Sequence, residues 1–283
     1  MGANEFDALQ PFALTLPGGV QLHAVRAGQG DPLIFIHGAM GDYRSWSAQW
    51  SAFTPHFDCI SYSRRYSFPN QNVMPSPDHS AIIEAQDLLA WMDASGIERA
   101  VLVGSSYGGF TALALAVHSP ARVQAVVAVE PPMMKYAAFT PKGRELAEAF
   151  RREVIEPAND AFRKGEDERA AQIMTGGING IQSSANHSTA MTRRLQNLLA
   201  MKMLALSSDE FPLLTPEQLQ GLSMPVMLMA GRQTQPVHKA IFDNVCAVMP
   251  QAQHVWVDGA GHAVSRDQPE KFNQVTLQFL RAT

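Results

Sequence analysis

The residue with the strongest chemical signature is Ser106, at the centre of a Gly-x-Ser-x-Gly pattern in residues 104–108. The pattern follows an apolar run typical of a buried strand and precedes a run typical of a helix. A sharp turn between the two pushes a serine oxygen out of the backbone, and Gly104 and Gly108 let neighbouring chain approach closely. The start of the helix also directs N–H groups and positive dipole towards an anion. This context predicts that Ser106 is a nucleophile.

A second loop, HGAMG at residues 37–41, could stabilise the negative charge that such a nucleophile creates. It follows the apolar run PLIFI at residues 32–36, which suits a strand buried on both faces. A backbone N–H at the end of such a strand can donate to an oxyanion. We expect the donors to be the N–H groups of Ala39 and of Tyr107, the residue after the serine.

A third loop, DGAGH at residues 258–262, supplies a histidine. It leaves the last expected strand and precedes the last expected helix, so His262 can reach the same end of the sheet as Ser106. A histidine in this setting can act as the general base that takes the serine proton. The other histidines lack such a setting.

The elements around these loops alternate between strand-like and helix-like segments, which predicts a parallel sheet covered on both faces. The first two strands are joined by Pro17-Gly18-Gly19, which indicates a hairpin. The expected strands span residues 12–16, 20–25, 32–36, 57–62, 100–103, 123–129, 226–230 and 254–257, and the expected helices span residues 78–94, 107–118, 237–249 and 269–280. Asp78 is the expected N-cap of the first of these helices.

The segment from Pro131 to about Ser223 breaks the alternation, because it contains amphipathic helical stretches and no convincing strand. Its clearest helical stretches are residues 143–158 and 191–206. An insertion of this size after a sheet strand predicts a helical cap over one end of the sheet.

Taken together, the motifs HGAMG, GSSYG and GAGH make the chain resemble the α/β-hydrolase fold family over essentially its whole length. The resemblance implies an α/β fold with a mostly parallel eight-stranded sheet, helices on both faces and an inserted helical cap. The serine should follow the fifth strand and the histidine the eighth. We therefore expect residues 1–130 and 216–283 to form the core domain, and residues 131–215 to form a cap, or lid, inserted after the sixth strand.

The chain departs from the family pattern at the acidic residue that usually follows the seventh strand. Thr234 stands at that position, in GRQTQP, and a threonine cannot supply the charge that orients an imidazole and stabilises imidazolium. Glu130 ends the sixth strand after an apolar run, where an unpaired carboxylate would be costly to bury. Some α/β-hydrolases, among them haloalkane dehalogenases and mycotoxin lactonases, place the acid there. The longer reach of glutamate could span the gap of about 4.8 Å between neighbouring strands.

Glu130 is therefore the expected third catalytic residue, with Ser106 and His262. Asp258 is its main rival because it lies four residues before the histidine, although it is expected to face away from the site. Asp42 and Asp243 are weaker rivals.

The composition limits the classes of function that fit this chain. Its 283 residues are 46% hydrophobic and 17% charged, which is enough apolar material for a sizeable core. The formal net charge of −4 and the absence of a basic stripe argue against nucleic-acid binding. Cys59 and Cys246 lie far apart, so neither a disulfide framework nor a metal site is expected. The chain shows no secretory signal and no apolar run long enough to span a membrane, which predicts a cytoplasmic protein.

The sequence thus predicts a serine hydrolase that cleaves a carboxylic ester or lactone with an apolar body, without metal or organic cofactor. Hydrolysis of a C–C bond, cofactor-free oxygenation and a non-catalytic ligand receptor are alternatives on the same scaffold. Arg64 and Arg65 follow the fourth strand, where they could bind a substrate carboxylate or form structural ion pairs. The natural substrate is left open, and so is the choice between a monomer and a homodimer.

Overall fold

The computed structural model describes residues 5–76, 78–180 and 188–283. An eight-stranded sheet in the order β1-β2-β4-β3-β5-β6-β7-β8 forms its centre. The pairs β1–β2 and β2–β4 are antiparallel and the other neighbours are parallel, so the expected mostly parallel α/β-hydrolase sheet is confirmed. The strands are β1 (Phe12–Thr15), β2 (Gln21–Ala27), β3 (Pro32–Ile36), β4 (Asp58–Tyr62), β5 (Ala100–Ser105), β6 (Val123–Val129), β7 (Val226–Gly231) and β8 (Gln253–Val257).

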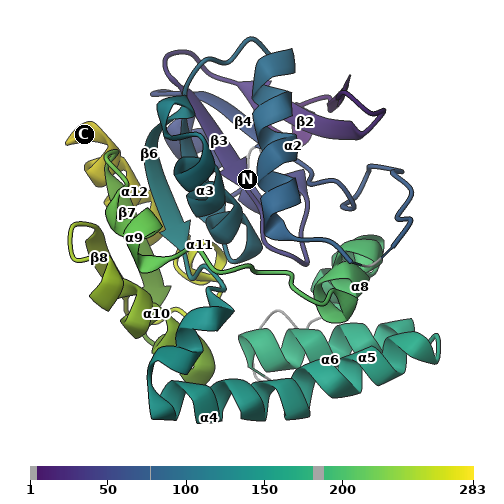
Figure 1. Ribbon diagram of the computed structural model, residues 1–283. Coiled ribbons are helices and arrows are strands. Elements are labelled where there is room, and N and C mark those ends of the chain that lie inside the picture. Colours follow the sequence, from purple (N-terminus) through teal and green to yellow (C-terminus); the bar gives the residue numbers. More distant parts are fainter. Residues whose placement is uncertain (1–4, 77, 181–187) are drawn as a thin grey trace.

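Helices cover both faces of this sheet (Figure 1). The α-helices are α1 (Trp50–Phe53), α2 (Ala81–Ala94), α3 (Tyr107–His118), α4 (Pro141–Phe150), α5 (Glu156–Arg163), α6 (Asp167–Asn179), α7 (Ser188–Gln196), α8 (Leu198–Leu206), α9 (Pro216–Gln220), α10 (Pro236–Val248), α11 (Val264–Asp267) and α12 (Pro269–Arg281). The 3₁₀ helices are η1 (Glu5–Ala8), η2 (Tyr43–Trp46), η3 (Pro120–Arg122) and η4 (Met134–Phe139), and a π-helical turn, η5 (Arg151–Ile155), joins α4 to α5.

The central strands are buried on both faces, which explains their continuous apolar sequences. Alternate residues of β3 enter opposite cores, because successive side chains of a strand point to opposite faces. Ile34 packs with α2 and α3, whereas Phe35 packs with α1 and α12. The first core contains Trp91 and Leu113, and the second contains Trp50.

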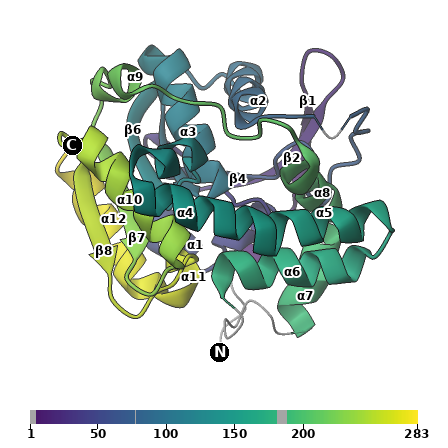
Figure 2. The same ribbon diagram turned by 60° about the horizontal axis from the view of Figure 1, so that its bottom comes forward.

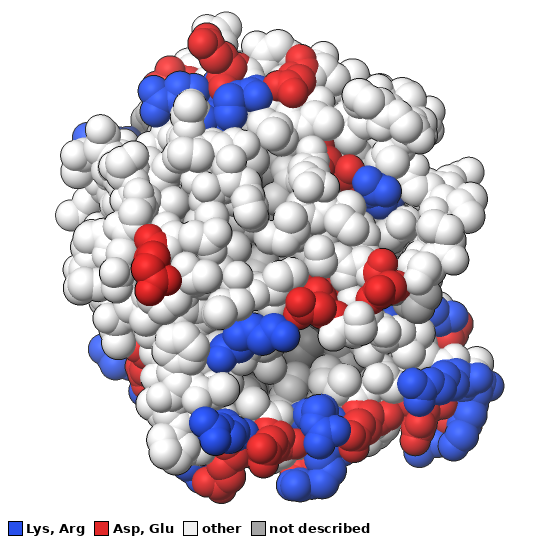
Figure 3. Space-filling model, in the orientation of Figure 1, with Lys and Arg blue, Asp and Glu red and all other residues white. Residues whose placement is uncertain are grey.

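Helices α4–α8, which lie between β6 and β7, cross the end of the sheet towards which the parallel strands point (Figures 1 and 2). Their inner sides share an apolar cluster of their own, built around Ala158, Phe162, Met174 and Met201. Charged side chains of both signs follow the outer edge formed by α4–α6 (Figure 3). This amphipathic division explains why the segment folds as helices over the sheet rather than continuing it.

One expected helix start was wrong, and two expected helical stretches are interrupted. The helix expected from residue 78 begins at Ala81, because Asp78 uses its carboxylate to accept hydrogen bonds from Ser208 instead of capping the helix. The stretch at residues 143–158 is interrupted by the π-helical turn. The stretch at residues 191–206 breaks at Asn197, whose buried amide donates to Asp42 at 2.9 Å.

No helix in the described ranges is both long enough and apolar enough to cross a membrane.

Candidate active site

Ser106 occupies a strained turn between β5 and α3, with φ 52° and ψ −119°. Within the described residues, the non-glycine positions with positive φ are Ser106 and Glu130, the latter at 43°. This conformation costs a non-glycine residue about 1–2 kcal/mol and tends to occur at functional sites. The two strained residues belong to the same site, which is described below.

Close backbone packing around this turn explains the glycines of the Gly-x-Ser-x-Gly pattern. A Cβ atom on Gly104 would lie 2.1 Å from the carbonyl oxygen of Gly108. A Cβ atom on Gly108 would lie 2.1 Å from the carbonyl oxygen of Ile36, at the end of β3. Only glycine fits these contacts, and they hold the serine turn against the start of the HGAMG loop.

The two expected oxyanion donors, Ala39 and Tyr107, come from these adjoining segments. Ala39 lines the same cavity as Ser106, and Tyr107 is the first residue of α3. Among the residues that the structure describes, neither backbone N–H has a hydrogen-bond partner. Both N–H groups are therefore unoccupied as hydrogen-bond donors within the described part of the chain.

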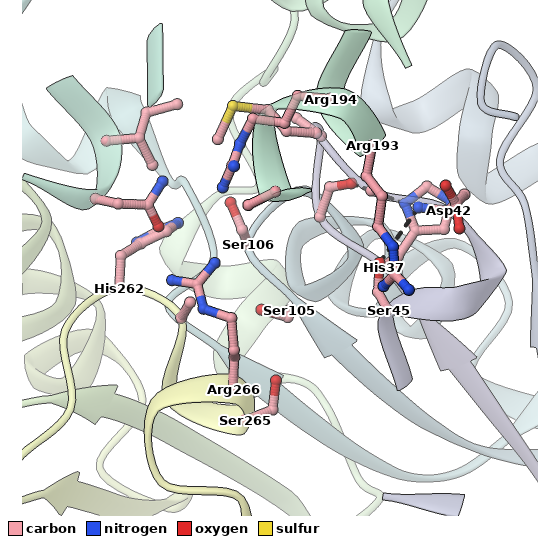
Figure 4. A pocket seen from close by; sticks show the side chains of 18 of the residues that line it. His37, Asp42, Ser45, Ser105, Ser106, Arg193, Arg194, His262, Ser265 and Arg266 are labelled. Carbon is pink, nitrogen blue, oxygen red and sulfur yellow. Dashed lines mark hydrogen bonds between the residues drawn. The ribbon is translucent and has the colours of Figure 1, made fainter. Parts of the chain in front are cut away.

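His262 and Glu130 are in close contact, since His262 Nδ1 lies 2.6 Å from Glu130 Oε2. Both side chains are buried. A carboxylate accepts hydrogen bonds, so Nδ1–H is the donor and Nε2 carries the lone pair. Within the described chain, His262 Nε2 has no hydrogen-bond partner, so it is not hydrogen-bonded to the Ser106 hydroxyl. Both residues nevertheless line the same cavity (Figure 4).

Two further donors hold the Glu130 carboxylate in place. The backbone N–H of Gly231 donates to Oε1 at 2.9 Å, and the Thr234 hydroxyl donates to Oε2 at 2.7 Å. Three hydrogen bonds therefore orient a carboxylate that would otherwise be buried at a high cost in free energy. Thr234, at the position where the family usually has an acid, is thus a hydrogen-bond partner of Glu130. Its place after β7, the neighbour of β6, is the sequence signal that could have indicated this contact.

The three rival acids all lie in other arrangements. The Asp258 side chain is 87% exposed and pairs with Arg232, so it faces away from the site. The Asp42 carboxylate pairs with Arg44 at 2.6 Å. Asp243 forms an ion pair on the surface of α10.

His238, a residue that the sequence did not single out, stacks on His262 with ring centroids 4.5 Å apart. Burial lowers the pKa of His238 well below its ordinary value, and neighbouring His262 adds to the effect. A neutral ring therefore packs against the proposed base. No sequence signal marked His238, because it follows the ordinary buried pattern of an amphipathic helix.

Arg64 and His37 support the HGAMG loop, residues 37–41, from behind. The Arg64 backbone N–H donates to His37 Nε2 at 3.0 Å, so the other ring nitrogen donates to the Gly38 carbonyl at 2.7 Å. Burial, aided by the nearby Arg64 charge, lowers the pKa of His37 to about 3. The Arg64 guanidinium is buried, pairs with Glu84 at 3.2 Å and stacks on the Tyr107 ring at 3.8 Å. Arg65 pairs with Asp87, so both arginines take the structural ion-pair option.

Ser106 and His262 open into a cavity of about 520 Å³. One wall is apolar and comes from the helices over the sheet. Its members are Met134, Phe150, Ile155, Met174, Ile178 and Leu204.

Comparison with known proteins agrees with this fold. The profile of the alpha/beta hydrolase family matches residues 33–275, and the chain belongs to this family. It is a hydrolase of the α/β fold.

Two relatives match most of the chain. The 2-hydroxy-6-oxo-6-phenylhexa-2,4-dienoate hydrolase of Comamonas testosteroni is 25% identical over 274 residues, which cover 92% of this chain and 91% of the relative. Carboxylesterase YbfK of Bacillus subtilis (strain 168) is 26% identical over 278 residues, which cover 91% of this chain and 83% of the relative. The crystal structure of carboxylesterase CesB (YbfK) from Bacillus subtilis superimposes with a TM-score of 0.73 at 22% identity, covering 97% of this chain and 92% of that chain.

Proposed function

We propose that this protein is a serine hydrolase that cleaves a carboxylic ester or lactone with an apolar body. The observation that carries the proposal is the 2.6 Å contact between His262 Nδ1 and Glu130 Oε2, in a site that also holds Ser106 at a strained strand-to-helix turn. A histidine held in this tautomer presents the lone pair of Nε2, which is what a general base for a serine needs.

The reaction runs through an acyl-enzyme. Ser106 Oγ attacks the carbonyl carbon as its proton passes to His262 Nε2, and the N–H groups of Ala39 and Tyr107 stabilise the oxyanion. The imidazolium, balanced by Glu130, then protonates the leaving alcohol. Water attacks the acyl-enzyme as His262 takes one of its protons, and return of that proton to Ser106 Oγ releases the acid.

The helices between β6 and β7 supply the substrate-binding wall in this proposal. We propose that residues 131–215 act as a cap domain over the core and that their apolar side chains bury the body of the substrate. Methionines such as Met134 and Met174 can adapt to different apolar shapes. No cofactor or metal takes part in any of these steps.

Labelling and turnover test the proposal together. The protein should react with a fluorophosphonate probe and hydrolyse p-nitrophenyl acetate, and Ser106→Ala should abolish both. Glu130→Gln should lower kcat on the order of 10³-fold or more, because the amide cannot balance an imidazolium. Circular dichroism and thermal unfolding serve as controls for folding. Wild-type turnover in Glu130→Gln would rule out the assigned acid, and wild-type labelling of Ser106→Ala would rule out the nucleophile.

Hydrolysis of a C–C bond is the second candidate, favoured by the similarity to the dienoate hydrolase of Comamonas testosteroni. The same serine, histidine and oxyanion donors could act on a ketone. Incubation with 2-hydroxy-6-oxo-6-phenylhexa-2,4-dienoate, with chromatographic detection of benzoate, tests it. Benzoate release together with failure to turn over simple esters would favour this candidate over the esterase.

A further inference from the structure

The cavity beside Ser106 is positively lined in a chain of net negative charge. Four arginines contribute to its wall, Arg44, Arg193, Arg194 and Arg266, while Asp42 is the single acid among the described lining residues. Arg44 and Asp42 neutralise each other at 2.6 Å. The whole chain carries a formal net charge of −4, so this concentration of positive charge is local to the cavity.

Two of these arginines approach Ser106 from different parts of the fold. Arg194 belongs to α7, in the segment between β6 and β7, and Arg266 belongs to α11, four residues after His262. Figure 4 shows both guanidinium groups directed into the cavity, one on either side of the Ser106 hydroxyl. A ligand bound between the two guanidinium groups would contact both the core and the overlying helices.

The two cations also act on each other. Burial lowers the pKa of Arg194 to about 10, and repulsion from Arg266 contributes. The Arg266 side chain is 42% exposed and its contact with Asp267 is long, at 3.4 Å. Like charges that face one cavity raise the free energy of the empty site, and a bound anion between them would relieve that repulsion.

We propose that Arg194 and Arg266 form an anion subsite and that the substrate is an ester or lactone bearing a carboxylate. The guanidinium fork donates paired hydrogen bonds that match the two oxygens of a carboxylate. The apolar wall would hold the body of the same molecule and Ser106 would meet its carbonyl. The position of the scissile bond rests on the proposed function, whereas the anion subsite rests on the arginines and the cavity.

Ligand binding tests the subsite without any turnover. Calorimetry with Ser106→Ala should show benzoate binding at least about tenfold more tightly than benzamide, which has the same shape without the charge. Raising the salt concentration should weaken benzoate binding and leave benzamide unchanged. Equal affinities for the two compounds would overturn the subsite.

Charge selectivity tests the same subsite during turnover, with two matched pairs of esters. One pair is 4-acetoxybenzoate and 4-acetoxybenzamide, with the charge on the leaving group. The other is the 4-nitrophenyl monoester of terephthalic acid and its carboxamide, with the charge on the acyl group. The charged member of at least one pair should have the higher kcat/KM by about tenfold or more. A ratio near one for both pairs would contradict the proposal.

Arginine variants identify the groups responsible. Arg194→Gln and Arg266→Gln should each lower the charged-to-neutral ratio of kcat/KM by about tenfold, towards one. A variant that is merely misfolded or badly packed would lower kcat/KM for the charged and the neutral ester equally and leave their ratio unchanged. That result would contradict a role of the substituted arginine in the subsite. Arg163→Gln, an exposed change of the same charge on α5, is the matched control and should keep the ratio of the wild type.

These experiments separate the two proposals. Benzoate selectivity without serine-dependent ester turnover would retain the anion subsite and reject the esterase. Serine-dependent turnover with no preference for charge in binding or rate would retain the esterase and reject the subsite.

Discussion

At the scale of single residues, the position of the proposed acid, Glu130, differs from the position after the seventh strand that the family resemblance led us to expect. Glu130 lies at the end of β6 and Thr234 follows β7, yet the Thr234 hydroxyl donates to Glu130 Oε2 at 2.7 Å. The threonine cannot carry the charge, but its hydroxyl can stabilise and orient the residue that does. We therefore interpret Glu130 and Thr234 as one functional unit whose two residues follow neighbouring strands.

Removing the Thr234 hydroxyl should weaken this unit without destroying it. Thr234→Val should lower kcat by about tenfold, because Glu130 would lose one hydrogen bond and keep its contacts with Gly231 and His262. Steady-state kinetics with p-nitrophenyl acetate would measure the effect. Thr234→Ser, which keeps the hydroxyl, should stay within about twofold of the wild type, and a similar loss in both variants would show that packing rather than the hydrogen bond matters.

At the scale of elements, Arg64 joins four segments behind the HGAMG loop. It contacts His37 after β3, follows β4 itself, pairs with Glu84 on α2 and stacks on Tyr107 at the start of α3. Glu84 is buried, which favours the neutral acid, but the Arg64 charge and a hydrogen bond from His79 outweigh burial and lower its pKa to about 2. The pair is thus an ionised contact inside the core.

Breaking this pair should destabilise the fold strongly. Arg64→Met should lower the free energy of unfolding by about 3–5 kcal/mol, since it leaves the Glu84 carboxylate buried without its cation. Adding Glu84→Gln should recover part of the loss by removing the isolated charge. Urea denaturation would measure both variants, with Arg65→Met as a comparison at a partly exposed ion pair that should cost less. A loss no greater than that of Arg65→Met would contradict the role of the buried pair.

At the scale of the whole molecule, Glu210 links the stability of the fold to pH. It lies in the connection between α8 and α9, and its backbone carbonyl accepts a hydrogen bond from Ala81 at the start of α2. Burial raises the pKa of its carboxyl group from 4.5 to about 8. The folded protein therefore keeps a proton that the unfolded chain has already lost at neutral pH.

This difference predicts a decline of stability with rising pH. The contribution of Glu210 is fully present below pH 4.5 and is lost as the pH rises towards 8, at about 1.4 kcal/mol per pH unit at most. Glu210→Gln keeps a neutral side chain of similar shape, so it should remove the decline. Urea denaturation of both proteins at pH 5, 6, 7 and 8 would show the variant gaining stability relative to the wild type across that range. A constant difference between the two proteins would exclude the titration of Glu210 as the cause.

The sequence by itself determined the order of strands and helices, because apolar periodicity and glycine-rich turns are local properties of the chain. The eight strands and the helix at residues 107–118 follow directly from such patterns. The same local signals marked Ser106, Ala39 and His262, since each stands at the end of an apolar run. The N-cap of α2 and the break at Asn197 escaped them, because both depend on partners about 130 to 155 residues away.

Only the tertiary structure decided which of these residues meet, because contacts across the sheet depend on strand order and register. It placed Glu130, rather than Asp258, against His262 and turned Thr234 into its hydrogen-bond partner. It also brought Arg194 and Arg266 to one cavity from positions 72 residues apart along the chain. The number of residues between two positions does not determine their distance in the folded chain. The charge and shape of the cavity therefore depend on how the helices over the sheet pack against the core.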